Sequence, residues 1–281
     1  MEQVYGVIGD PIGHSLSPLI HNDAFDYLNM NARYHAFQVK GEELEQAVKG
    51  MKALGIKGFN VTVPHKVSII PFLDELDESA QLLHAVNTVK NEDGRLIGFN
   101  TDGYGFYLSL KEHIDNTNPR DLKVLLIGAG GAARAIYTTL AKEGFAFIDI
   151  VNRTAERAHL LKENCSYETK GNVYSFQQLD QTSNEYDVII QTTSIGMKPN
   201  IEEKPIELTG RVHGGTVVAD IIYNPLKTML LKEAEKLGLK TVDGVGMFVY
   251  QGACAFQIWT NVEPDVSRMK KLVYEKLGGK S

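Results

Sequence analysis

Residues 123–136, KVLLIGAGGAARAI, constrain the fold more than any other part of this sequence. An apolar run leads directly into Gly128-x-Gly130-x-x-Ala133, and a helical pattern follows at once. In dinucleotide-binding proteins the first glycine permits a tight turn, the second lets a pyrophosphate approach the backbone, and the third small residue allows close helix–strand packing. The unpaired N–H groups at the start of the helix face the phosphates. The motif predicts a dinucleotide site; the alternative is a tight turn with a structural role only.

The end of the next apolar run indicates which dinucleotide is bound. An NAD site usually has an acidic residue there for the ribose 2′-hydroxyl. This run ends instead in Asn152, Arg153 and Thr154, with Arg157 one helical turn beyond, and Asp149 lies too early in the run. Two guanidinium groups four residues apart can make charge-assisted contacts with a 2′-phosphate. The pattern favours NADP, with a plain N-cap at Thr154 and a solvated face at Arg157 as the alternatives.

Apolar runs and helical patterns alternate along the chain, which is typical of an α/β protein with mainly parallel sheets. A polar, turn-rich passage at 112–121 separates two such series and suggests two domains. The first series predicts strands at 4–10, 32–39 and 58–63, helices at 18–29, 42–55 and 73–85, and a hairpin at 86–100 that turns at Asp93-Gly94. The second predicts strands at 122–128, 145–152, 186–193 and 215–221, and helices at 131–144, 227–238, 246–261 and 263–278.

Composition excludes several classes of function. The net charge is −6 and no run of four basic residues occurs, so we expect no nucleic-acid partner. The N-terminus lacks a signal-peptide pattern, and no apolar segment approaches the roughly 18–20 residues that span a bilayer, so we expect a cytoplasmic protein without membrane contact. Cys165 and Cys254 form no CxxC pair and the histidines form no ligand motif, so we expect no metal site.

Nine segments between residues 7 and 259 occur in an order that carries a resemblance. They are VIGDPIGHSLSPLIHN, GFNVTVPHK, AVNTV, GFNTDG, GAGGAARA, NRTAER, TSIGM, DIIYNP and DGVGMFVYQGACAFQIW. This set closely resembles the shikimate dehydrogenase family, which reduces 3-dehydroshikimate to shikimate with NADPH in the biosynthesis of aromatic amino acids. The resemblance implies an N-terminal α/β substrate domain (1–103) completed by C-terminal helices (244–281), and a Rossmann-like NADP-binding domain (104–243). The active site would then lie between the domains.

The resemblance assigns the catalytic pair. It implies that Lys66 of VPHK and Asp102 of NTDG are catalytic. Hydride transfer to the C3 carbonyl produces an alkoxide, which the Lys66 ammonium would stabilise and protonate; in the reverse direction neutral Lys66 would accept the proton. Asp102 would hydrogen-bond the substrate hydroxyl and orient Lys66. From the residues alone, Lys66 would be a surface lysine in the first turn of a helix.

The family also suggests the substrate contacts. Ser15 and Ser17 of HSLSP would bind the carboxylate, and Ser17 before Pro18 is in addition a natural helix N-cap. Residues with donors and acceptors suited to the ring hydroxyls, or placed in the pocket by resemblance alone, are Asn60, Thr62, Asn87, Tyr223 and Gln251.

The expected cofactor contacts surround the glycine motif and the strand ends that follow it. They are Glu78, Gly128, Ala129, Gly130, Gly131, Ala132, Asn152, Arg153, Thr154, Arg157, Thr193, Ser194, Ile221, Gly244 and Met247. One departure from the family concerns the loop after Gln191, where many members have NATS and this chain has QTTS. The contacts of Thr193 and Ser194 therefore depend on a loop that differs from the family pattern.

Two alternatives remain beside an NADP-dependent shikimate dehydrogenase. One is a broader quinate/shikimate dehydrogenase that uses NAD, which Arg153 and Arg157 argue against. The other is a ligand sensor without catalysis, which the presence of Lys66 and Asp102 argues against. The expected state of assembly is a monomer or a homodimer.

Overall fold

A computed structural model gives the structure of the protein and describes residues 2–114 and 117–278. The chain divides into two compact units: unit 1 lies within Met1–Thr101 and Gln251–Ser281, and unit 2 within Asp102–Tyr250. Parts of two predicted segments lie outside the described residues. They are residues 115 and 116 of the expected boundary passage, and residues 1 and 279–281 of the expected substrate domain.

The observed division differs from the expected domain boundaries at helix α9 (Gly244–Thr260), because residues 244–250 fall in unit 2. Packing explains this assignment. A Cβ atom placed on Gly246 would lie 1.9 Å from Oγ of Ser109, and Met247 packs against the core of unit 2. The first turns of α9 therefore belong to unit 2, and the rest of the helix belongs to unit 1.

Unit 1 contains a six-stranded mixed sheet. Its strands are β1 (Gln3–Gly9), β2 (Ala32–Gln38), β3 (Gly58–Val61), β4 (Glu75–Leu76), β5 (Thr88–Glu92) and β6 (Arg95–Phe99), in the order β2-β1-β3-β5-β6-β4. Strand β1 is parallel to β2 and β3, whereas β5 is antiparallel to β3 and β6. The predicted hairpin accounts for the antiparallel part, and its turn residues Asp93 and Gly94 have φ angles of 49° and 94°.

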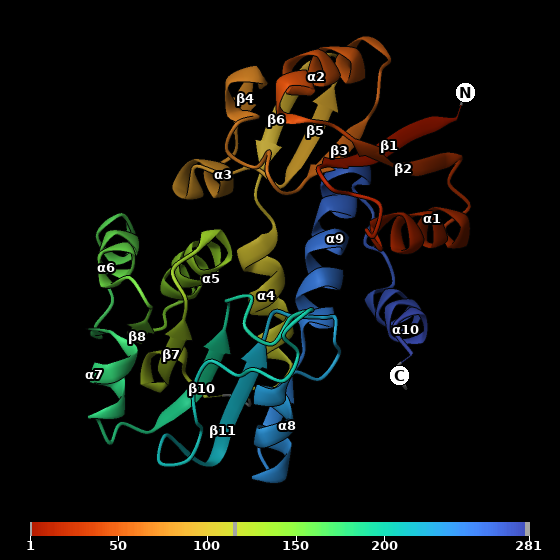
Figure 1. Cartoon of the computed structure of the whole chain (residues 1–281). Helices are drawn as coiled ribbons and strands as arrows, with labels where there is room; N and C mark the ends of the chain where they lie inside the picture. Colours follow the sequence, from red (N-terminus) through yellow and green to blue (C-terminus); the bar gives the residue numbers. More distant parts are fainter. Residues whose placement is uncertain (1, 115–116, 279–281) are drawn as a thin grey trace. The chain divides into compact units, whose positions relative to one another are not determined.

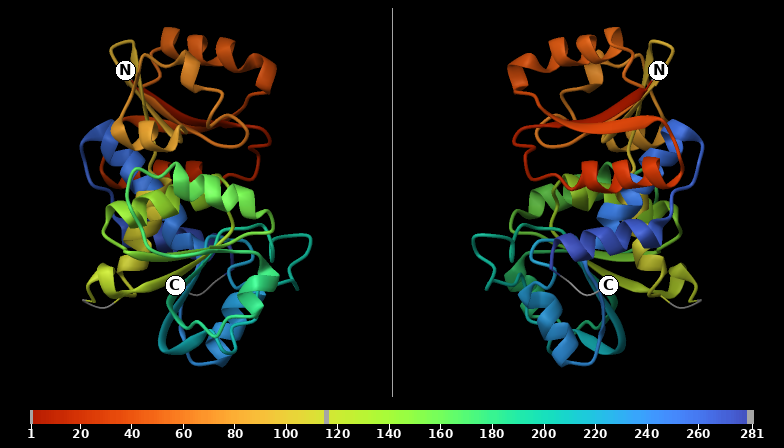
Figure 2. Two further views of the ribbon diagram at one scale, coloured as in Figure 1. Left: turned by 90° about the vertical axis from the view of Figure 1, so that its left-hand side faces the viewer. Right: turned by 90° about the vertical axis from the view of Figure 1, so that its right-hand side faces the viewer.

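Helices cover both faces of this sheet. The helical segments of unit 1 are α1 (Ser17–Tyr27), η1 (Gly41–Glu43), α2 (Leu44–Ala53), η2 (Ile70–Phe72), α3 (Glu78–Leu83), the later part of α9, and α10 (Val266–Lys276). Figure 2 shows α1 and α2 on opposite sides of the sheet. On the α1 side, Trp259 of α9 lies against Gly58, where a Cβ atom would be 2.3 Å from the indole, and the indole donates to the carbonyl oxygen of Val89 at 2.9 Å. This absence of a side chain is what lets α9 pack directly on β3.

Four strand ends of unit 1 meet at one edge of the sheet. The parallel strands β1 and β3 both end there, and because Asn60 is in register with Thr88 and Thr88 with Phe99, β5 begins there and β6 ends there. We call this edge the polar edge of unit 1. It includes the loops that follow β1, β3 and β6 and the loop that precedes β5.

One predicted helix of the first series is wrong in part, and so is the placement of Lys66 in the first turn of a helix. Residues 73–85 were predicted as one helix, but Glu75 and Leu76 form β4 because they pair with Ile97 and Gly98. Helix α3 then begins at Glu78, after Asp77 caps it by accepting the amide of Ser79 at 2.9 Å. Lys66 does not lie in the first turn of a helix, because residues 64–69 form successive turns before η2.

Unit 2 contains six parallel strands (Figure 1). They are β7 (Lys123–Ile127), β8 (Phe147–Val151), β9 (Val173–Tyr174), β10 (Tyr186–Gln191), β11 (Val212–Asp220) and β12 (Lys240–Val242), in the order β12-β11-β10-β7-β8-β9. Counted from β7, this is the 3-2-1-4-5-6 order of dinucleotide-binding folds, whose ligand crevice lies where the strand order reverses. That switch point falls between β7 and β10.

The helices of unit 2 pack on both faces of its sheet. They are α4 (Asp102–Lys111), η3 (Pro119–Asp121), α5 (Gly131–Lys142), α6 (Ala155–Glu163), α7 (Phe176–Asp180) and α8 (Met229–Lys236). Apolar residues of α4, α5 and α6 share one core with alternate residues of the strands, and those of α7 and α8 share another. Within residues 2–114 and 117–278, none of the helices combines the length and the apolar character that a membrane crossing requires.

In each unit one buried side chain has a pKa that is strongly shifted within the acidic range: His21 in unit 1 and Asp220 in unit 2. In unit 1, burial lowers the pKa of His21 to about 3. In unit 2, burial raises the pKa of Asp220 to about 6, although the carboxylate accepts the amide of Ile222 at 3.0 Å and the hydroxyl of Thr228 at 2.8 Å. Asp220 lies at the end of β11 and is 1% exposed, so its ionised form is costly in the folded protein.

Asp220→Asn should therefore stabilise the protein at neutral pH. An Asp with a raised folded-state pKa contributes stability that is present below the unfolded-state value of 3.8 and is lost as the pH rises through about 6. A shift of this size corresponds to about 3 kcal/mol, and the amide has no such loss. Urea unfolding at a series of pH values between 4.5 and 7 measures the free energy of unfolding of both proteins. The difference in favour of the variant should increase as the pH rises. A constant difference across the series would contradict the assignment.

Candidate functional site

The loop after β1 places both predicted serines at the start of α1. The helix begins at Ser17, with Leu16 as N-cap and Pro18 in the first turn, so the expectation that Ser17 is the N-cap is wrong. The hydroxyl of Ser15 instead accepts the backbone amide of Ser17 at 3.2 Å. Ser17 is buried, with 7% of its surface exposed. Because its hydroxyl makes no capping bond, it can make other contacts.

The end of β3 carries the next group of predicted residues. Asn60 is buried, and its amide donates to the carbonyl oxygen of Asn87 and to the hydroxyl of Thr88, both at 3.1 Å. The amide of Thr62 bonds the carbonyl oxygen of Ile8 at 3.0 Å, which holds the strand end against β1. Lys66 follows in the turns, half-buried, and its carbonyl oxygen accepts the amide of Val86 at 2.7 Å.

Asn87 joins the beginning of β5 to the segment after β6. Its Oδ1 accepts the amide of Thr101 and the hydroxyl of Thr88, each at 2.9 Å, and its Nδ2 donates to Thr101 Oγ1 at 2.9 Å. Thr101 Oγ1 also donates to the carbonyl oxygen of Gln251 at 3.0 Å. The structure thus brings Asn60, Asn87 and the backbone of Gln251 into one hydrogen-bonded network at the polar edge of unit 1.

Asp102 is the residue that follows this network in the chain. It is half-buried and opens α4, the first element of unit 2, and the peptide bond before it belongs to Thr101. The amide and hydroxyl of Thr101 are both fixed by Asn87, so the position from which α4 starts is defined within unit 1. Lys66 thus lies in the turns that follow β3, and Asp102 lies in the segment that follows β6.

Three residues of this network were not predicted from the sequence. Thr88 and Thr101 lie inside the quoted segments AVNTV and GFNTDG, where each adjoins a predicted residue and could have been included on that ground. Tyr34 was predicted only as part of a strand, and its hydroxyl donates to Asn60 Oδ1 at 2.7 Å.

In unit 2 the glycine turn has the geometry that the sequence predicted. Gly128 has φ of 111°, and a Cβ atom there would lie 2.5 Å from Oγ1 of Thr192, so only glycine fits. Gly130 is the N-cap of α5, and no atom lies within 4 Å of a Cβ built on Gly130 or Gly131. Ala133 is fully buried in the core beneath them. The backbone around Ala129 and Ala132 consequently presents the start of α5 to open space, as a bound pyrophosphate requires.

The loop after β10 explains the departure from the family pattern. Gln191 is fully buried, and its Oε1 accepts the amide of Thr193 at 2.9 Å and the hydroxyl of Thr193 at 3.0 Å. Its Nε2 donates to the carbonyl oxygen of Ile195 at 2.9 Å. Thr192 adds a bond from its hydroxyl to the carbonyl oxygen of Ile127 at 2.6 Å, and Ser194 is exposed on the same loop. The buried glutamine thus fixes this loop beside the glycine turn.

The segment after β8 holds the predicted 2′-phosphate contacts. Asn152 donates to the carbonyl oxygen of Thr154 at 2.7 Å, and Thr154 is the N-cap of α6 by position, although its hydroxyl makes no capping bond. Arg153 and Arg157 are exposed, and within the part of the chain that the structure describes neither guanidinium is engaged in an ion pair. Asp149 cannot serve as the ribose acid, because it accepts the amide of Asn172 and the hydroxyl of Tyr186.

The loops after β11 and β12 come together at the same carboxyl edge. A Cβ atom on Gly244 would lie 2.3 Å from the carbonyl oxygen of Ile221, and the ring of Tyr223 lies 5.2 Å from that of Phe248. Met247 is half-buried against the core. Every predicted cofactor residue of unit 2 therefore follows one of the strands β7, β8, β10, β11 or β12, whereas Glu78 lies in α3 of unit 1.

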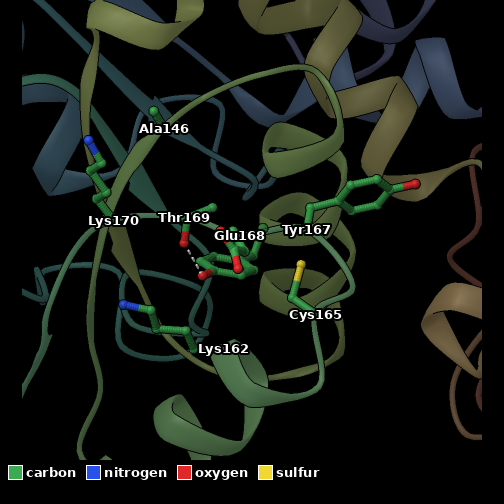
Figure 3. A pocket seen from close by; sticks show the side chains of 8 residues that line it. Ala146, Lys162, Cys165, Tyr167, Glu168, Thr169 and Lys170 are labelled. Carbon is green, nitrogen blue, oxygen red and sulfur yellow. Dashed lines mark hydrogen bonds between the residues drawn. The ribbon is translucent and has the colours of Figure 1, made fainter.

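A cavity on unit 2 lies away from these loops. Figure 3 shows this cavity, of about 460 Å³, between α5, the end of α6 and the segment before β9. Its lining residues are Tyr137, Ala146, Lys162, Cys165, Tyr167, Glu168, Thr169 and Lys170. None of these is a predicted site residue, and the loops that carry the predicted residues do not contribute to it. No group of His, Cys, Asp and Glu within residues 2–114 and 117–278 could hold a metal ion.

The residues of unit 2 fit NADP. The start of α5 offers unobstructed backbone N–H groups, Gly128 provides the turn, and two exposed guanidinium groups lie after β8, where the 2′-phosphate of an adenosine ribose binds in this fold. The turn at Gly128 has the predicted geometry, and the contacts of these residues with NADP stay predictions.

Comparison with known proteins extends the likeness to the whole chain. Residues 7–89, 110–240 and 244–274 match the models of the shikimate dehydrogenase substrate binding domain, of shikimate/quinate 5-dehydrogenase and of the shikimate 5′-dehydrogenase C-terminal domain. The NADP(+) shikimate dehydrogenase of Bacillus licheniformis is 53% identical over 281 residues, with 100% of both chains covered.

Two solved structures agree with this result. The shikimate 5-dehydrogenase of Listeria monocytogenes, in complex with shikimate and NAD, is 37% identical with a TM-score of 0.89, and 97% of this chain and 96% of that chain are covered. The shikimate 5-dehydrogenase of Thermus thermophilus, in complex with NADP(H) and shikimate, is 32% identical with a TM-score of 0.86, and 97% and 99% are covered. With family models matching most of its length and relatives matching all of it, this chain belongs to the shikimate dehydrogenase family.

Proposed function

We propose that this protein catalyses the reversible, NADPH-dependent reduction of 3-dehydroshikimate to shikimate in the biosynthesis of aromatic amino acids. The observation that carries the proposal is the identity of 53% over the full length with a relative named as an NADP(+)-dependent shikimate dehydrogenase. The open start of α5 and the exposed arginines after β8 support the choice of cofactor.

We assign substrate binding to unit 1 and NADP binding to unit 2. In unit 1, the hydroxyls of Ser15 and Ser17 would hold the carboxylate at the start of α1, where the helix dipole also favours an anion. The residues that we assign to the ring hydroxyls are Asn60, Thr62, Asn87 and Gln251 of unit 1, together with Tyr223 of unit 2. Hydrogen bonds fix the side chains of Asn60 and Asn87.

Lys66 and Asp102 would carry out the proton transfer. When NADPH is bound, it supplies the hydride that reduces the C3 carbonyl. The Lys66 ammonium then stabilises the negative charge that develops on the carbonyl oxygen and donates a proton to it. Asp102 accepts a hydrogen bond from the neighbouring substrate hydroxyl and orients the lysine, and in the oxidative direction neutral Lys66 takes the proton back.

Arg153 and Arg157 would recognise the 2′-phosphate, and the loops holding Thr193, Ser194, Ile221, Gly244 and Met247 would surround the nicotinamide, with Glu78 approaching from unit 1. The acidic overall charge supports the expectation that no nucleic acid is bound. A cytoplasmic location and a monomeric or homodimeric state stay predictions.

Initial rates of cofactor reduction test the function directly. Shikimate and quinate would each be offered with NADP⁺ and with NAD⁺, and the near-ultraviolet absorbance of the reduced cofactor would be followed. We expect the rate with shikimate and NADP⁺ to exceed the other three. Comparable rates with quinate or NAD⁺ would indicate a broader quinate/shikimate dehydrogenase, and no rate despite measurable shikimate binding would indicate a ligand sensor.

Lys66→Ala should reduce kcat by about 10²–10⁴-fold, because a positioned acid–base group acts mainly in the transition state. The KM for shikimate and the KM for NADP⁺ should change by no more than about threefold. Lys57→Ala, which removes an exposed lysine of the same unit, is the matched control and should retain full activity. A kcat within a few-fold of the parent would show that Lys66 does not have this role.

Arg153→Ala combined with Arg157→Ala should weaken NADP⁺ binding far more than NAD⁺ binding. Each charge-assisted contact with a phosphate contributes about 1.5–3 kcal/mol, so the loss of two such contacts should reduce NADP⁺ affinity by at least about 150-fold. Calorimetric titration with each cofactor measures the difference, with Arg120→Ala as a control for a surface arginine of unit 2. Equal losses for both cofactors would mean that these arginines do not contact the 2′-phosphate.

A further inference from the structure

Tyr34 occupies a buried position behind the substrate residues of unit 1. It lies in β2, in register with Tyr5 of β1, and is 1% exposed. Its hydroxyl donates to Oδ1 of Asn60 at 2.7 Å. This bond connects strand β2 with the asparagine near the end of β3.

The direction of each hydrogen bond in this connection follows from its neighbours. The Asn60 amide nitrogen donates to the carbonyl oxygen of Asn87 and to the hydroxyl of Thr88, so the carboxamide oxygen must be the atom that faces Tyr34. A carboxamide oxygen can only accept, so the Tyr34 hydroxyl must donate to it.

We propose that Tyr34 is a positioning residue of the substrate site, which fixes the orientation of the Asn60 carboxamide by donating a hydrogen bond to its oxygen. The inference rests on the proposed function, because that function assigns Asn60 to the substrate.

The surroundings of Tyr34 hold it rigidly in this role. The backbone amide of Tyr34 donates to Asn22 Oδ1, and Asn22 Nδ2 donates to the carbonyl oxygen of Tyr34, both at 2.9 Å. One side chain of α1 therefore holds both backbone groups of the residue. The ring stacks on His21 with centroids 4.4 Å apart. Burial raises the pKa of Tyr34 well above its ordinary value, so the hydroxyl stays protonated and able to donate at every pH at which the enzyme works.

Tyr34→Phe tests the proposal, because it keeps the ring and removes only the hydroxyl. The Asn60 oxygen then has no partner and the carboxamide is no longer fixed. We expect the KM and the calorimetric Kd for shikimate to rise about 5–50-fold, with kcat and the KM for NADP⁺ within about threefold of the parent. Tyr5→Phe is the matched control, since Tyr5 is the register partner of Tyr34, is 2% exposed and bonds only Gln3 through its hydroxyl.

A double-mutant cycle separates positioning from a general structural effect. If Tyr34 acts through Asn60, then adding Tyr34→Phe to Asn60→Ala should weaken shikimate binding by less than about twofold beyond Asn60→Ala alone. A structural effect would instead be additive in the two backgrounds. An unchanged KM in Tyr34→Phe, an equal change in Tyr5→Phe, or additivity in the cycle would each overturn the proposal.

A second variant covers the case in which Tyr34→Phe does not fold. Thr88→Val removes the acceptor on the other side of the Asn60 carboxamide, so it should raise the KM for shikimate in the same way and leave the KM for NADP⁺ unchanged. No change in the KM for shikimate would overturn the proposal. The parent is assayed first: no turnover of shikimate by the parent would refute the proposed function, whereas turnover with unaffected variants would refute only the role of Tyr34.

Discussion

The carboxamide of Asn87 is the interaction on which the polar edge of unit 1 depends. It fixes Thr101, the last residue before the chain enters unit 2, and Thr101 in turn bonds the carbonyl oxygen of Gln251, the first residue after the chain returns. Both passages of the chain therefore leave unit 1 from one hydrogen-bonded point. Residues that are 150 positions apart in sequence thus share one anchor, and the proposed acid–base residue Asp102 starts directly from it.

Unit 2 depends on a different constraint, the parallel direction of its six strands. Because every strand ends at the same edge, five loops from distant parts of the sequence are gathered there without any specific bond between most of them. One loop does need a specific support. Gln191 supplies it with a buried side chain that bonds the backbone on both sides of Ser194, so a departure from the family sequence is accommodated by a local network.

The sequence predicted what depends on short-range patterns. The glycine turn, the hairpin at Asp93 and the longer strands of both sheets are local, whereas the short strands β4, β9 and β12 were not predicted. The family likeness supplied the remaining site residues. What could not be predicted depends on partners far along the chain. Tyr34 looked like an ordinary core residue of an alternating strand, because its bond to Asn60 spans 26 residues. The helix predicted at 73–85 is interrupted since Glu75 and Leu76 pair with a strand about twenty residues later.

The two buried ionisable groups give the units opposite responses to acid. The low pKa of His21 means that the unfolded form of unit 1 binds the extra proton, so this unit loses stability as the pH falls from 6.5 towards 3. The raised pKa of Asp220 makes unit 2 lose stability in the opposite direction, as the pH rises from 3.8 towards 6. Across the mildly acidic range the two losses offset each other in the molecule as a whole. The two halves therefore carry pH sensitivities of opposite sign: acid weakens the half that holds the buried histidine, and an approach to neutrality weakens the half that holds the buried aspartate.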